Sequence, residues 1–113
     1  MADLDANQVV GLLLASDRLR VFVRDGRIVT IPARLARRRL LLDAVAQGFE
    51  PGVRYPESVV SSFLAQLYGD HAALRRYLVD EGFLSRDHGE YWRSAGTVDV
   101  SVPADPRAGE AAR

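Results

Sequence analysis

The chain has no cysteine, and none of its 15 basic residues is a lysine. Without cysteine it has no disulfides and no thiol nucleophile. Its two histidines cannot complete a tetrahedral zinc site by themselves. A Gly-rich phosphate loop is also missing, and no serine has a histidine at a catalytic spacing. We therefore expect a protein that is not an enzyme and has no catalytic residues, cofactor or metal ligands.

The chain of 113 residues also has no excess of positive or negative charge, because 15 acidic residues balance the 15 arginines. The length fits one domain with a modest core. The apolar run Val9–Ala15 is too short to span a bilayer, and the acidic start, with Asp3 and Asp5, is unlike a signal peptide. Together with the missing cysteines, this pattern predicts a cytoplasmic protein without a membrane partner.

Three segments are expected along the chain. Residues 1–17 form an N-terminal helix, with Val9 and Leu13 on its apolar side, that packs on the domain or on a second copy of the chain. Residues 18–93 form the main domain. Residues 94–113 form a last strand over 97–102 and a disordered tail over 103–113.

The segment 19–31 has the pattern of a β-hairpin. Apolar residues alternate with arginines from Leu19 to Arg24, Asp25-Gly26 supplies a turn, and residues 28–31 form the returning strand. An alternative interpretation makes residues 17–24 a short helix that ends at Gly26.

From residue 32 onward the sequence predicts helices followed by a second hairpin. The helices are expected over 32–48, from Pro56 to about Tyr68, and over 71–81, with Asp70 capping the last one. Strands over 83–87 and 90–93 then flank His88-Gly89. This order is typical of an α+β fold, a small winged-helix-like domain of three to four helices with a short β-hairpin wing. Such domains most often bind nucleic acid.

The helix over 71–81 presents two different faces. Leu74, Tyr77 and Leu78 cluster toward the core. The opposite face carries Ala72, Arg75, Arg76 and Val79, so two guanidinium groups flank a small residue that lets a nucleic-acid backbone approach. The alternative is a solvated face in which Arg76 pairs with Asp80 and Arg75 reaches Glu57.

A second basic patch lies between residues 18 and 39, where eight arginines accompany one acid, Asp25. Arg37, Arg38 and Arg39 fall in the early turns of a helix, where the helix dipole disfavours each cation by about 0.3–1 kcal/mol. An acid within the fold (Asp3, Asp5 or Asp43) or a phosphate backbone could offset this cost. The three arginines spread over about 200° of helix surface, so they cannot all face one ligand.

The second hairpin adds further candidates for contact with phosphates, namely Arg86, His88 and Arg93. Tyr91 and Trp92 could stack on bases, but adjacent strand residues point to opposite faces of a sheet. One of the two aromatic side chains is therefore expected in the core.

Several separated motifs, including Asp25-Gly26-Arg27, Phe49-Glu50-Pro51-Gly52, Leu74-Arg75-Arg76 and Tyr91-Trp92-Arg93, resemble a known bacterial family, the domain of unknown function numbered 2087. The resemblance covers about residues 24–93. It implies a winged-helix-like fold and an association with transcriptional regulators, but no catalytic or ligand residues. The segment Leu12–Val21 also resembles the opening helix of an ArsR-type regulator, although the rest of such a module is missing.

The sequence thus predicts a DNA-binding transcriptional regulator that binds double-stranded DNA and could form a homodimer through the N-terminal helix or the apolar strand near Val100. The alternative is a protein-interaction module that docks on another regulator or on the transcription machinery, and RNA or ribosome binding is a third possibility. The candidate nucleic-acid contacts are Arg37, Arg38, His71, Ala72, Arg75, Arg76, Arg86, His88 and Arg93.

Overall fold

The structure is a computed structural model that describes residues 4–94. The predicted strand over 97–102, the tail over 103–113, Asp3 and Val100 lie outside these residues. No helix of the described part is long and apolar enough to cross a membrane.

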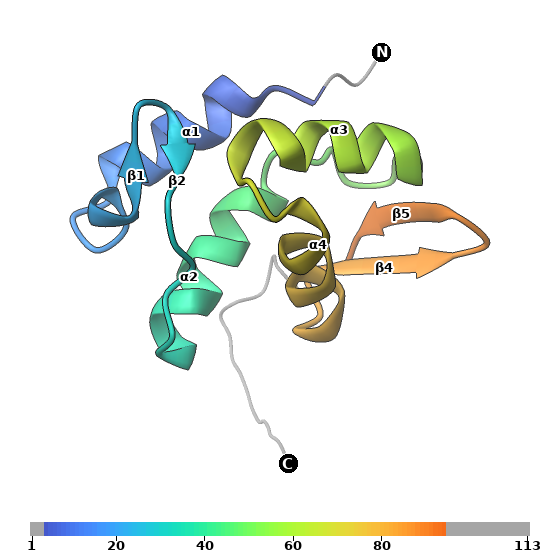
Figure 1. Ribbon diagram of the computed structural model, residues 1–113. Helices are drawn as coiled ribbons and strands as arrows, with labels where there is room; N and C mark the ends of the chain where they lie inside the picture. Colours follow the sequence, from blue (N-terminus) through green and yellow to red (C-terminus); the bar gives the residue numbers. More distant parts are fainter. Residues whose placement is uncertain (1–3, 95–113) are drawn as a thin grey trace.

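The fold is α+β and winged-helix-like (Figure 1). Within residues 4–94, four helices share one core with two small antiparallel sheets, which confirms the predicted fold class. In chain order the elements are α1 (Ala6–Ala15), the 3-10 turn η1 (Arg20–Phe22), β1 (Val23–Arg24), β2 (Arg27–Ile28), α2 (Leu35–Ala46), β3 (Tyr55–Pro56), α3 (Glu57–Leu67), α4 (His71–Asp80), β4 (Leu84–Asp87) and β5 (Glu90–Arg93).

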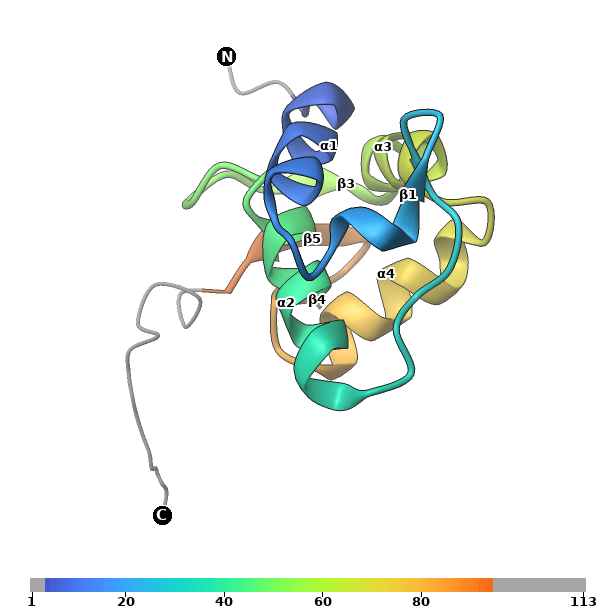
Figure 2. The ribbon, with the colours of Figure 1, turned by 90° about the vertical axis from the view of Figure 1, so that its left-hand side faces the viewer.

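The N-terminal helix α1 packs on α2 and α3 and is part of the common core (Figure 2). Val9 and Leu13 are fully buried, and the Asp5 side chain caps the helix by accepting a hydrogen bond from the Asn7 amide. A Cβ atom at Gly48 would lie 2.8 Å from Val9 Cγ2. This contact explains why a glycine follows α2, since any side chain there would push α1 away from the core.

The first hairpin is shorter than predicted, and both interpretations of residues 17–31 are partly wrong. Residues 20–22 form a 3-10 turn, and only Val23–Arg24 and Arg27–Ile28 pair as strands. The 3-10 spacing brings Leu19 and Phe22 to the same side, toward the core, and leaves Val21 68% exposed. A continuous strand would have put Leu19 and Val21 on one face. The chain instead buries Leu19 together with Phe22, so packing against the core decides the local structure and the alternating pattern does not.

The helix-turn-helix consists of α3 and α4, and it follows the predicted boundaries within about one residue. Asp70 caps α4 as expected, with its side chain accepting a hydrogen bond from the Ala73 amide at 3.1 Å. Leu74 and Leu78 are fully buried, and Tyr77 packs against the core from a half-buried position. The core-facing side of α4 is therefore the side that the sequence predicted.

A three-stranded sheet with the order β3-β5-β4 supports this helix pair. The β4-β5 hairpin turns at His88-Gly89, where both residues have positive φ, as a two-residue type I′ turn requires. It projects beyond α4, on the side away from the β1-β2 hairpin (Figure 1). We call this hairpin the wing. Tyr91 is buried and Trp92 is half-buried under Arg54, which confirms that one aromatic of the pair is in the core.

Candidate nucleic-acid interface

The outer face of α4 and the wing enclose a hollow of about 420 Å³. We call it the α4–β4 hollow. It is lined by Ala72, Arg75, Arg76, Val79, Asp80 and Arg86. Three guanidinium groups face one carboxylate, so the lining has a formal charge of +2 in a chain whose net charge is zero. The predicted arginine pair on α4 and the wing residue Arg86 thus line one surface.

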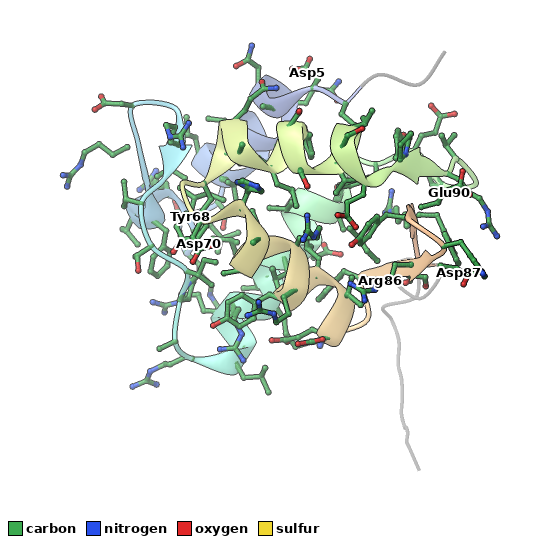
Figure 3. The ribbon with its side chains drawn as sticks, turned by 45° about the vertical axis from the view of Figure 1, so that its right-hand side comes forward. Asp5, Tyr68, Asp70, Arg86, Asp87 and Glu90 are labelled. Carbon is green, nitrogen blue, oxygen red and sulfur yellow. The ribbon has the colours of Figure 1, made fainter. Side chains whose placement is uncertain are left out.

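The strand register explains how Arg86 reaches the helix. Leu84 and Arg86 lie two residues apart on β4 and therefore share one face of the sheet. Arg86 is paired with Tyr91 across the hairpin, and Leu84 and Tyr91 are both buried. Arg86 is therefore on the inward face of the sheet, beyond the last buried residue of β4, and lies beside α4 (Figure 3). Asp87 and Glu90 lie toward the outer end of the wing (Figure 3).

Arg75 is held in place by a set of side chains between α3, α4 and the wing. Its Nη1 atom donates a hydrogen bond to Ser61 Oγ at 2.6 Å and lies 4.0 Å from Glu57 Oε2. Its guanidinium carbon is 6.0 Å from the centre of the Tyr91 ring, over the ring face. The predicted contact of Arg75 with Glu57 is therefore present, although the guanidinium still lines the hollow.

Arg76 and Arg86 are exposed, and neither side chain has a hydrogen bond or ion pair to another residue within 4–94. The pair between Arg76 and Asp80 that the sequence allowed does not form within this range, although Asp80 lines the same hollow. An uncompensated guanidinium on an exposed helix face is fully available to an anion in solution.

The second basic patch does not form a single surface, because several of its arginines have partners in the fold. Arg38 Nε donates to Glu81 Oε2 at 2.7 Å, and Arg39 Nη1 lies 3.4 Å from Glu81 Oε1. The rings of Tyr77 and Phe83 lie beneath these two guanidinium groups.

Glu81 is the acid that offsets Arg38 and Arg39 of α2, and neither Asp5 nor Asp43 pairs with them within residues 4–94, whereas Asp3 lies outside the described residues. The Glu81 side chain is only 12% exposed, and the Arg38 side chain is 19% exposed. Sequence spacing could not identify this pairing, since it joins the end of α4 to α2 over 43 positions. The Arg37 side chain remains exposed and has no hydrogen bond or ion pair to another residue of the range 4–94.

The other candidates lie apart from the hollow. His71 is half-buried at the start of α4. His88 is exposed in the wing turn, with Nδ1 2.8 Å from Asp87 Oδ1. Arg93, on β5, donates to the Phe49 carbonyl oxygen at 3.4 Å. Across residues 4–94, no group of three or more His, Asp or Glu side chains is placed to hold a metal ion.

Residues 27–93, more than half of the chain, match the family DUF2087, described as "Uncharacterized protein conserved in bacteria". The chain belongs to this family. The DUF2087 match includes β2 to β5, and hence the whole helix-turn-helix and wing, whereas α1 and β1 precede it. No curated protein and no solved structure matches the chain.

Proposed function

We propose that this DUF2087 protein is a DNA-binding regulator of transcription that binds duplex DNA through α4 and the base of the wing. The observation that carries the proposal is the α4–β4 hollow, which Arg75, Arg76 and Arg86 line together with Ala72. A helix-turn-helix presents its second helix to the major groove, and arginines there bind phosphates or the edge of guanine. Ala72 lets the DNA backbone approach α4 closely.

The charge distribution along the wing supports a contact at its base. Arg86 lies beside α4, whereas Asp87 and Glu90 add carboxylates toward the outer end of the wing (Figure 3). Arg54 Nη1 lies 3.6 Å from Glu90 Oε1 and offsets that charge, so Asp87 leaves the outer end with a single net negative charge, whereas the positive hollow attracts a phosphate backbone. The wing therefore serves to place one arginine next to the recognition helix.

Salt dependence tests this proposal most simply. Binding to a labelled duplex of random sequence should weaken as salt rises from about 50 to 200 mM, with a slope of log K against log salt near −3 if three arginines each neutralise a phosphate. Fluorescence anisotropy gives both affinity and slope. A slope near zero, or no binding at the lowest salt, would contradict the proposal.

A protein-interaction module is the second candidate function. It is favoured by the net charge of zero and by exposed apolar side chains, of which Val21 at 68% and Leu35 at 56% are the most exposed. Such side chains indicate contact with another protein where they form one contiguous apolar patch. An absence of duplex binding, together with a stable complex with a purified regulator, would select this function.

A further inference from the structure

Glu57 places a negative charge at the edge of the surface that we propose for DNA. It is the first residue of α3, and its carboxylate accepts a hydrogen bond from the Tyr91 hydroxyl at 3.1 Å. The other carboxylate oxygen lies 4.0 Å from Arg75 Nη1. Glu57 therefore contacts the one arginine of the hollow that has an acidic partner within 4.0 Å among residues 4–94.

We propose that Glu57 is an affinity-determining residue that competes with duplex phosphate for Arg75. This inference rests on the proposed function and adds to it a built-in limit on DNA affinity. An amino-terminal helix end favours an anion, as does a guanidinium group. The start of α3 and the Arg75 guanidinium lie close together, so both attract an anion to the same position, and the Glu57 carboxylate is already there.

The two partners of Arg75 contribute differently. Ser61 accepts the short hydrogen bond of 2.6 Å and orients the guanidinium without changing its charge. The Glu57 contact is at 4.0 Å, and the Glu57 side chain is 52% exposed. An exposed ion pair at this distance contributes little to stability, so a phosphate can replace the carboxylate without disturbing the fold. The contact therefore affects binding more than folding.

Replacing Glu57 with glutamine tests the inference. The amide oxygen can still accept the Tyr91 hydrogen bond, so the substitution removes the charge and keeps the shape. We expect Glu57→Gln to bind a random-sequence duplex about threefold to tenfold more tightly, with a salt slope steeper by up to about one. Asp17→Asn is the matched control, because it also removes the charge of a carboxylate that pairs with an arginine. Asp17 Oδ1 lies 3.3 Å from Arg20 Nη2, in the segment between α1 and β1.

The same substitution in an Arg75→Ala background completes a double-mutant cycle. If Glu57 acts through Arg75, the gain from Glu57→Gln should largely disappear when Arg75 is absent. An equal gain in both backgrounds, or the same gain from Asp17→Asn, would show a general effect of net charge and overturn the inference. If the unmodified protein binds duplex and Glu57→Gln changes nothing, the inference alone fails. If neither protein binds duplex at low salt, the proposed function fails, and the inference fails with it.

Discussion

Replacing both Arg76 and Arg86 with alanine is expected to weaken duplex binding by about tenfold to a hundredfold and to reduce the salt slope by about two. The two side chains come from α4 and β4 and line the same hollow. Both side chains are exposed and have no hydrogen bond or ion pair within residues 4–94, so their removal leaves the fold intact. Arg75 is less suited to this test because its hydrogen bond to Ser61 joins α4 to α3. Anisotropy with a labelled duplex measures the affinity, and circular dichroism checks the fold.

The matched control is Arg18→Ala with Arg24→Ala, which changes the net charge by the same amount. Both of these arginines are exposed near η1 and β1, and neither side chain has a hydrogen bond or ion pair in the described part of the chain. They belong to the second basic patch, so the comparison also tests whether that patch binds DNA. Equal losses in the two double variants would indicate attraction by overall charge. A loss confined to the control pair would move the interface to the first hairpin.

Phe49→Ala is expected to lower the free energy of unfolding by about 3–5 kcal/mol, the usual range for a buried phenylalanine. Phe49 is fully buried between Tyr55 of β3 and Phe63 of α3, with ring centres at 5.4 and 5.3 Å and nearly perpendicular planes. Edge-to-face rings contribute beyond their buried area. This cluster joins the three-stranded sheet to the helix-turn-helix, so a cavity there weakens the packing of the sheet against α3.

Urea unfolding followed by circular dichroism measures this loss, which is a large fraction of the stability of a small domain. Phe22→Ala is the control, because Phe22 packs on the core from a half-buried position. We expect its loss to be no more than about half that of Phe49→Ala. Losses of equal size would contradict a central role for the aromatic cluster.

The helix-turn-helix and the wing could be predicted from the sequence because each of their signals is local. Asp70 caps α4, Gly69 interrupts the chain before it, and His88-Gly89 fits a tight turn. The structure of residues 17–31 was harder to predict, because the apolar residues there fit both the alternating pattern of a strand and the i, i+3 pattern of a helical turn. Only packing against the core decides between Val21 and Phe22 as the inward residue.

The candidate interface could be predicted only in part. The outward positions of Ala72, Arg75 and Arg76 follow from helical periodicity. The meeting of Arg86 with α4 depends on how the wing folds back, and the pairing of Glu81 with Arg38 and Arg39 joins distant segments. A periodic pattern within one element cannot reveal such contacts, so the sequence could not distinguish arginines available to DNA from arginines bound within the fold.

Chemical-shift mapping by NMR tests the central claim, DNA binding through the α4–β4 hollow, most directly. The ¹⁵N-labelled protein is titrated with a short duplex of random sequence at low salt, and amide and arginine side-chain signals are followed. We predict that the largest changes fall on Ala72, Arg75, Arg76 and Arg86, with small changes across α1 and η1. Changes centred on Arg18 and Arg24, or no changes at saturating duplex, would contradict it.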